Sequence, residues 1–295
     1  MDPTLKSRTI ARLKAALPEL SPQMRTAAKY IVDHQGPFGI DSIRATAKNA
    51  GVSTYSLIRL AERLGFSGFD DLRAPFRHAL ATTGTLAHVP GWIEELRRSG
   101  ATGQVLADAA HNTLSVVQTS LERQSPEAME RAVSMALGAR KVYLTAMRSS
   151  WGLAYHFHYI GRMALTSLEL IPHHMNSAID DLNASGPDDA LIAITVTPYS
   201  RETIEACEFA QSRGVKLILI TDSEVMASNF SPEVTLVAST ISTHHFGSFA
   251  GVMAVLETLL AILVKQGGDA AAKRIASYEA LRREHNVYWS AQAKR

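Results

Sequence analysis

The chain has very little cysteine, and this absence excludes two kinds of site. Cys207 is the only cysteine among 295 residues, so neither an intramolecular disulfide nor a thiolate metal centre can form. The histidines lack metal-binding spacing as well, because His156 and His158 would not share a helix face and the pairs at 173–174 and 244–245 diverge. We therefore expect no metal and no cofactor, and a Cys207 that is buried like a small apolar residue.

Long apolar runs and a leader pattern are also lacking. No run of about 18 apolar residues is present that would span a bilayer, and Met1 to Arg12 is charged and polar rather than basic and then apolar. These features predict a cytoplasmic protein that does not contact a membrane. A composition of 46% hydrophobic and 20% charged residues is typical of a globular chain with one large or two ordinary domains.

Charge is distributed unevenly along the chain. Residues 1–80 contain 12 Lys and Arg against 7 Asp and Glu, and residues 270–295 contain 6 against 2, whereas the middle of the chain has 12 against 19. A positive N-terminal segment favours a nucleic-acid partner, although solvated helix faces are often basic too.

The stretch from Thr46 to Leu60 has the spacing of a helix-turn-helix. Ala47 is small where two helices must cross, Gly51 permits the turn, and Ser53 is a suitable N-cap for a second helix that begins near Thr54. The exposed face of that helix would present polar groups to phosphates and base edges in the major groove. The candidate DNA-binding residues are Ser53, Thr54, Tyr55, Ser56, Arg59 and Lys48. A helical hairpin that binds protein, or nothing, is the alternative.

Breaking residues and helix signals divide the chain into parts. A helix is predicted from the Ser21 cap to about His34, and the glycine- and proline-containing segment 35–39 is expected to break it. We predict an all-α helix-turn-helix domain over residues 1–80. Small and breaking residues then predict a linker over 81–103.

From residue 140 onward, short apolar runs alternate with helical patterns. Strands are predicted at 141–146, 167–171, 190–197, 216–221 and 234–238, with crossover helices at 151–165, 200–213 and 248–265. This alternation predicts an α/β domain over 104–267 with a parallel sheet flanked by helices. Residues 268–295 are predicted as a C-terminal helix, whose apolar stripe would cap the sheet domain or pack across a dimer.

Two loops that follow predicted strands carry hydroxyl groups before a helix. They span residues 146–150 and 195–202, and ligands of parallel sheets bind beyond the carboxyl ends of the strands. Helix N-termini with nearby hydroxyls favour an anion, although each hydroxyl could instead be an ordinary N-cap. The candidate effector-binding residues are Arg148, Ser149, Ser150, Thr195, Thr197, Ser200 and Glu202.

Residues 20–80 resemble the DNA-binding domain of the RpiR family of bacterial transcription regulators. Ala47, the run Gly51–Ser53, Arg59 and the run Leu64–Phe69 carry this resemblance. Residues from about 104 to 267 resemble that family's sugar isomerase (SIS) domain. The resemblance implies the helix-turn-helix and SIS folds, a DNA partner and a phosphosugar ligand.

The SIS-like loops depart from the family pattern. Family members usually show Gly-x-Gly-x-Ser and Ser-x-Ser-Gly-x-Thr-x-Glu, where this chain has Ala-Met-Arg-Ser-Ser at 146–150 and Thr-Val-Thr-Pro-Tyr-Ser-Arg-Glu at 195–202. The resemblance implies that Ser150 and the second loop's hydroxyls contact a sugar phosphate. Ala146 and Arg148 replace glycines that allow close approach to a phosphate, and Pro198 removes an N–H donor.

The sequence thus predicts a non-enzymatic transcription regulator that binds double-stranded operator DNA. Its SIS-like domain would form a homodimer or homotetramer and bind a small anionic metabolite, such as a sugar phosphate. Two alternatives stay open: a phosphosugar isomerase with Glu202 and His245 as candidate bases, or a SIS domain used only for dimerisation. Arg148 could bind the anion, fill the pocket or form a structural ion pair.

Overall fold

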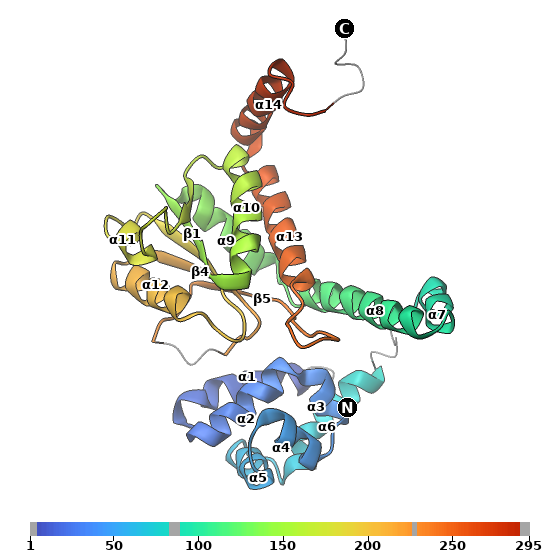
Figure 1. Ribbon diagram of the computed structural model, residues 1–295. Coiled ribbons are helices and arrows are strands. Elements are labelled where there is room, and N and C mark those ends of the chain that lie inside the picture. Colours follow the sequence, from blue (N-terminus) through green and yellow to red (C-terminus); the bar gives the residue numbers. More distant parts are fainter. Residues whose placement is uncertain (1–4, 83–88, 226–228, 290–295) are drawn as a thin grey trace. The chain divides into compact units, whose positions relative to one another are not determined.

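The computed structural model describes residues 5–82, 89–225 and 229–289, and it contains two compact units (Figure 1). The main boundary between them along the sequence lies between Gly103 and Gln104. The first unit is all-α, and the second is an α/β domain with a parallel sheet. The predicted fold class is therefore confirmed.

The N-terminal unit is a group of helices around an aromatic core. Phe38 contacts Phe69 and Phe76 edge-on, at ring-centroid distances of 5.6 and 5.0 Å. Its first elements are α1 (Leu5–Ala16), the 3-10 helix η1 (Leu17–Glu19), α2 (Pro22–Asp33), α3 (Gln35–Ile40), α4 (Ile43–Ala50), α5 (Thr54–Arg63) and α6 (Phe69–Thr82).

Two of these helices differ from the sequence prediction. Helix α1 was not predicted, and the segment 35–39, expected to break the chain, forms α3. Pro37 is tolerated there because it lies in the first turn, where a backbone N–H has no intrahelical acceptor to lose. Burial of Phe38 then holds this short helix in the core.

Part of the segment expected to be a linker is helical. Residues 83–88 lie outside the described residues, whereas α7 spans Gly91–Arg98 and α8 spans Ala101–Glu122. Pro90 and Gly91, interpreted from sequence as breakers, instead begin α7, since proline suits a helix start. Ile93 is fully buried, which gives the helix an apolar anchor.

The second unit contains one five-stranded parallel sheet. Its strands are β1 (Val142–Ala146), β2 (Leu168–Ile171), β3 (Ala190–Ile194), β4 (Lys216–Thr221) and β5 (Val234–Val237), in the order β2-β1-β3-β4-β5. All four pairings are parallel. The predicted strands are present, although the third ends at Ile194 rather than at Thr197.

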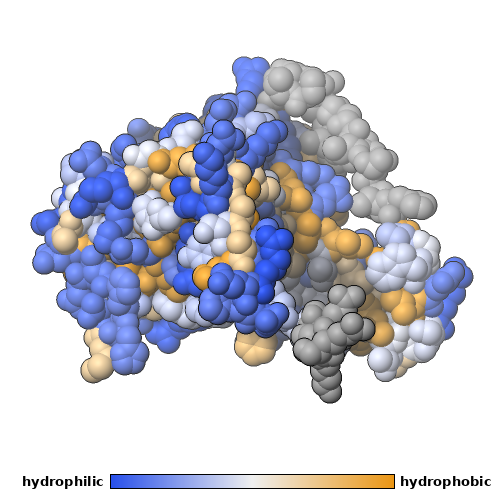
Figure 2. All heavy atoms as spheres, turned by 90° about the horizontal axis from the view of Figure 1, so that it is seen from above, coloured by the Kyte–Doolittle hydropathy of each residue, from blue (hydrophilic) through white to orange (hydrophobic). Residues whose placement is uncertain are grey.

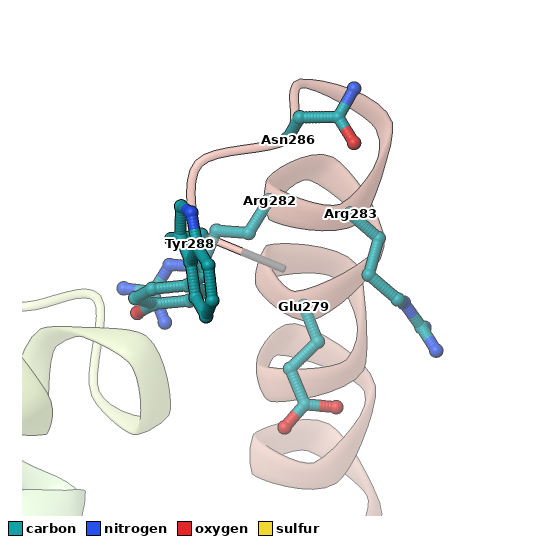
Figure 3. Close-up of a pocket in the computed structure, with 6 residues that line it drawn as sticks. Glu279, Arg282, Arg283, Asn286 and Tyr288 are labelled. Atoms are coloured by element: carbon teal, nitrogen blue, oxygen red, sulfur yellow. The ribbon is translucent and has the colours of Figure 1, made fainter. Parts of the chain in front are cut away.

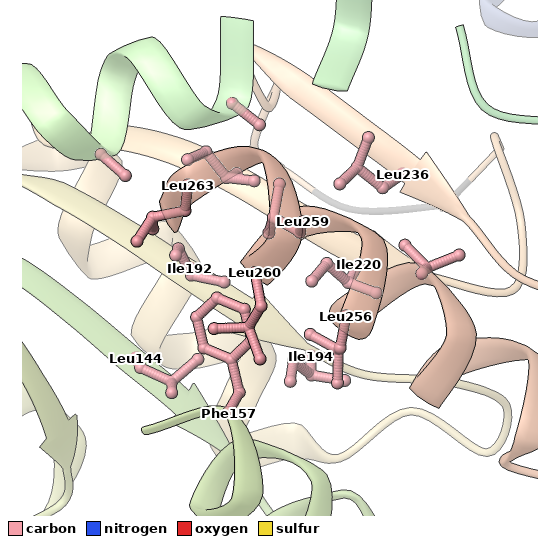
Figure 4. Close-up of a cluster of buried hydrophobic side chains, with 14 of the residues drawn as sticks. Leu144, Phe157, Ile192, Ile194, Ile220, Leu236, Leu256, Leu259, Leu260 and Leu263 are labelled. Atoms are coloured by element: carbon pink, nitrogen blue, oxygen red, sulfur yellow. The ribbon is translucent and has the colours of Figure 1, made fainter. Parts of the chain in front are cut away.

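Helices cover both faces of the sheet. One face carries α9 (Pro126–Gly138), α10 (Trp151–Ala164) and α13 (Ala250–Gln266) over a large aliphatic core, in which α13 lies across the strands (Figure 4). The other face carries α11 (Ala178–Leu182) and α12 (Arg201–Ser212). Helix α11 was not predicted, since its five residues are too few for a helical pattern to show.

Cys207 lies on α12 and is fully buried, as expected. Burial in apolar surroundings raises the pKa of its thiol to about 12, so the thiolate is almost absent near neutral pH. The side chain therefore serves as packing.

The C-terminal helix, α14, spans Gly268–Glu284 and packs against α10 and α13. It was expected to continue to residue 295, but it ends earlier, where Asn286 takes a left-handed conformation with φ +48°. Residues 290–295 lie outside the described residues. Within those described, no single helix is long and apolar enough to cross a membrane, and α13 passes that test only together with α14, from which it is bent by 108°.

Phe157 gives a test of the α/β core. It is fully buried between α10 and the sheet (Figure 4), so Phe157→Ala should lower the free energy of unfolding by about 3–5 kcal/mol. Tyr155→Ala is the matched control, because this ring on the same helix is 58% exposed. Equal effects in urea denaturation would contradict the packing described.

Candidate DNA-binding and effector sites

The predicted helix-turn-helix consists of α4 and α5, and a serine caps the N-terminus of each helix. Ser42 caps α4 by accepting from the Ala45 N–H at 3.3 Å, and Ser53 caps α5 by accepting from the Ser56 N–H at 3.1 Å. Between them Gly51 takes φ +67°, a left-handed conformation that favours glycine. The turn predicted from sequence is thus formed by the residues expected to form it.

Helix α5 buries one face and exposes the other. Leu57 and Leu60 are fully buried, and α5 packs against α2, α4 and α6. The Tyr55 side chain is 68% exposed and that of Arg59 is 55% exposed. This helix can therefore present Tyr55 and Arg59 to a groove of DNA.

The remaining candidates are divided between surface and capping positions. Ser53, Thr54 and Lys48 are exposed. Ser56 is half-buried, and its hydroxyl is 2.9 Å from that of Ser53, so it belongs to the capping arrangement. The candidate set accordingly contains both contact-forming and helix-starting residues.

The sequence prediction missed two residues on the exposed side of α5. Ile58 is partly exposed beside Tyr55, and Glu62 forms an ion pair with Arg59 at 2.9 Å. Helical spacing from Tyr55 and Arg59 was the signal that could have identified them. Glu62 orients the Arg59 guanidinium in the free protein.

The two candidate effector loops meet at the carboxyl edge of the sheet. β1 pairs with β2 on one side and with β3 on the other, so the chain reverses its direction of travel across the sheet between β1 and β3. Ligands of open α/β sheets bind at such a switch point. The Arg148 Nη2 atom of the first loop lies 3.1 Å from the Glu202 Oε1 atom of the second, which joins segments 54 residues apart.

The hydroxyl groups of these loops differ in exposure. Ser150 and Thr195 are buried, whereas Ser149 and Thr197 are exposed. Thr195 Oγ1 accepts from the Ser200 N–H at 3.3 Å. The Ser200 hydroxyl caps α12 by accepting from the Thr203 N–H at 3.4 Å. Ser200 is therefore an N-cap, as the alternative interpretation of the loop hydroxyls proposed, and it also lies in the candidate effector loop.

Arg148 takes the ion-pair alternative. Its backbone has φ +57°, the left-handed conformation for which the family pattern uses glycine at this position. The side chain is 74% exposed and pairs with Glu202. The loop thus keeps a glycine-like backbone although its side chain is large.

Glu202 is held in its charged form. Its Oε2 atom accepts from the Ser200 hydroxyl at 2.6 Å. That hydrogen bond, followed by bonding to its own backbone N–H and the nearby Arg148, lowers the pKa of the Glu202 carboxyl. A lowered pKa makes Glu202 a weak general base near neutral pH.

Asp222, which directly follows β4, is a further carboxylate at this edge. Its Oδ2 atom accepts from the Thr197 N–H at 3.2 Å and from Thr240 Oγ1 at 3.4 Å. Its Oδ1 atom is buried and has no hydrogen-bond partner among the described residues. A polar residue at the end of a strand next to β3 was the signal for it, and the sequence prediction did not use it.

A separate hollow of about 550 Å³ lies at the end of α14 (Figure 3). It is lined by Glu279, Arg282, Arg283, Asn286, Tyr288 and Trp289. Arg274, on the same helix as the hollow, donates to the carbonyl of Ala164, the last residue of α10. The loop that contains Arg148 lies at the opposite end of α10, before its first residue. The hollow is therefore distinct from the effector loops. Among the described residues, no group of three or more His, Cys, Asp or Glu side chains could hold a metal ion.

Comparison with known proteins identifies both domains. Residues 8–83 match the family model "Helix-turn-helix domain, rpiR family", and residues 137–265 match the SIS domain model. The chain is 26% identical over 250 residues, or 81% of its length and 86% of the relative's, to the uncharacterized HTH-type transcriptional regulator YfhH of Escherichia coli (strain K12). It also matches 33% of the length of a bifunctional protein glk from Paraburkholderia xenovorans (strain LB400), at 25% identity over 74% of this chain.

Solved structures support the same fold. The sugar isomerase domain of an RpiR transcription factor from Sphaerobacter thermophilus is 25% identical, with a TM-score of 0.57, over 60% of this chain and 99% of that one. The Vibrio vulnificus NanR protein, solved in complex with ManNAc-6P, is 17% identical, with a TM-score of 0.54, over 94% of this chain and 98% of that one.

An N-terminal helix-turn-helix followed by a SIS domain defines a transcription regulator, since the helix-turn-helix is a DNA-binding type of domain. The chain belongs to the RpiR family of transcriptional regulators. The predicted family, inferred from Ala47, the run Gly51–Ser53, Arg59 and the run Leu64–Phe69, is confirmed.

The Arg148–Glu202 pair should contribute little to stability. Both side chains are exposed, so Arg148→Ala should change the free energy of unfolding by less than about 1 kcal/mol. Arg140→Ala is the comparison, because Arg140 pairs at 2.6 Å with the fully buried Asp189, and removing the only cation paired with that buried carboxylate among the described residues should destabilise the protein more than Arg148→Ala does. Urea denaturation of the two variants measures the difference, and a larger loss for Arg148→Ala would refute this assignment.

Proposed function

We propose that this regulator binds a specific operator through α5 and is controlled by a small anionic metabolite, of the phosphosugar class, at the loops after β1 and β3. The observation that carries this proposal is the meeting of the two hydroxyl-bearing loops at the switch point, with Arg148 at their junction. Binding of the metabolite would alter how the protein presents its DNA-binding domains.

The DNA contacts are assigned to the exposed side of α5 and its approach. Arg59 and Tyr55 have the chemistry to contact base edges, and Lys48 of α4 that to contact a phosphate. Ser53 and Thr54 lie at the start of α5, where backbone N–H groups favour phosphate. The Arg59–Glu62 ion pair is exposed, so Arg59 loses little free energy when it leaves Glu62 to contact a guanine.

The effector class is argued from the chemistry of the second unit. Ser149, Ser150, Thr197 and Ser200 supply hydroxyls on the same two loops as the Arg148 guanidinium, a set suited to a sugar and an anionic group. The structure of NanR with ManNAc-6P shows that a protein of this fold binds a phosphosugar. We infer that this chain also binds a phosphosugar, and we assign the ligand class rather than the particular sugar.

A phosphosugar isomerase is the less favoured function. Isomerisation needs a base whose pKa lies near the working pH, whereas the pKa of Glu202 is lowered by its contacts with Ser200 and Arg148. His245, the other candidate base, is exposed and packs edge-on against Phe246. We therefore propose binding without turnover, and conversion of a sugar phosphate by the pure protein would overturn this.

We also propose that the protein acts as a homo-oligomer. Leu114 and Leu121 of α8 are exposed and lie seven residues apart, on the same face of the helix. On the face of the molecule seen in Figure 2, hydrophobic residues show among hydrophilic ones. Exposed leucines on one helix face suit contact with a second copy.

Arg59→Ala tests the operator assignment. Its affinity for an operator selected from genomic fragments should fall roughly tenfold or more, because a base contact is lost. Lys48→Ala should instead weaken binding to all sequences and lower the salt slope by about one. Fluorescence anisotropy at several salt concentrations separates the two effects. Arg98→Ala, an exposed arginine outside the helix-turn-helix, is the control, and an unchanged affinity in Arg59→Ala would refute the assignment.

Ser150→Ala tests the effector site. A phosphosugar at roughly 100 times its Kd should raise the wild-type Tm by several degrees, and this shift should be lost in the variant. Ser212→Ala, at the far end of α12 and exposed, should keep the full shift. A shift that persists in Ser150→Ala would place the ligand elsewhere.

A further inference from the structure

Glu202 occupies the groups that an anionic ligand would use. One oxygen of its carboxylate lies 3.1 Å from Arg148 Nη2, and the other accepts from the Ser200 hydroxyl at 2.6 Å. In the described structure, both donors are therefore already bound to a negative charge from the chain itself.

A second carboxylate occupies a third donor. The Thr197 N–H, which follows β3 in the same loop, donates to Asp222. Two carboxylates of the chain thus already accept from donors of these loops, and a phosphate that approached those donors without displacing a carboxylate would be repelled by it. The loops therefore have the hydrogen-bond donors of an anion site but lack the excess of positive charge that such a site would have.

Glu202 can leave this position at little cost. Its side chain is 46% exposed and that of Arg148 is 74% exposed, so the two can separate by side-chain rotation into water without opening the core. Exposed ion pairs contribute little to stability. Asp222, whose Oδ1 atom is buried, does not have this freedom.

We propose that Glu202 is the specificity-determining residue of the effector site, an internal counter-anion that the ligand's anionic group displaces from Arg148 and Ser200. This inference rests on the proposed function of the loops. It restricts effectors to molecules whose anionic group reaches both donors at once. A neutral sugar leaves Glu202 in place and binds weakly.

Glu202→Gln tests the inference. The amide keeps the size of the side chain and removes its charge, so the concentration of inorganic phosphate that gives half of the maximal Tm shift should fall about fivefold to tenfold. Chloride replaces phosphate at constant ionic strength in the reference titration, which removes general screening effects. ManNAc-6P, titrated in the same way, should show a change in the same direction.

Glu205→Gln is the matched control. Glu205 lies one turn further along α12, is 49% exposed and pairs with Arg201 at 3.2 Å. Its substitution removes the same charge from the same helix and should leave both titrations unchanged. The double variant Arg148→Ala, Glu202→Gln should lose the gain in affinity, because the freed guanidinium is then absent.

The outcomes separate the inference from the function on which it rests. Tighter binding in Glu202→Gln but not in Glu205→Gln supports the inference. If wild type binds phosphate or ManNAc-6P and Glu202→Gln binds it equally or more weakly, the counter-anion role is overturned while the effector site stands. If neither wild type nor Glu202→Gln binds either compound, the anionic effector class itself is overturned.

Discussion

The parallel pairing of β1 with β3 is the constraint on which the effector site depends. Ala146, the last residue of β1, is in register with Ile194, the last residue of β3. Both strands therefore end at the same level, and the loops that follow them leave the sheet side by side. Because β2 pairs with the other edge of β1, one loop leads toward α10 and the other toward α12, and the proposed effector site lies between them.

The DNA-binding domain depends instead on local signals, which is why so much of it could be predicted from sequence. Ser42, Gly51 and Ser53 each act through hydrogen bonds or backbone conformations within a few residues. Such contacts are encoded in short stretches of sequence. The core residues Leu57 and Leu60 followed from helical spacing. The short helix α3 was missed because tertiary burial of Phe38, which no local pattern shows, holds it together.

The effector site could be predicted only in part, because its decisive contacts join distant segments. The loops and their hydroxyls followed from the alternation of strands and helices, and the glycine-like backbone of Arg148 agrees with the family pattern. The pairing of Arg148 with Glu202 and the bonding of Asp222 to Thr197 require the strand order β2-β1-β3-β4. Sequence spacing gives the strands but not which of them are neighbours. The hydroxyls of the loops predicted an anion site, whereas in the structure Glu202 already contacts Arg148 and Ser200, and Asp222 already accepts from Thr197.

The burial of Cys207 has a practical consequence for studies of this molecule in solution. A thiol with a pKa near 12, inside a packed helix–sheet interface, does not compete for maleimide or nitroxide reagents at neutral pH. A cysteine introduced at any exposed position would therefore be the one labelled, with no need to remove the native residue first. Spin or fluorescent labels on α5 could then report the surroundings of this helix in an otherwise unmodified protein.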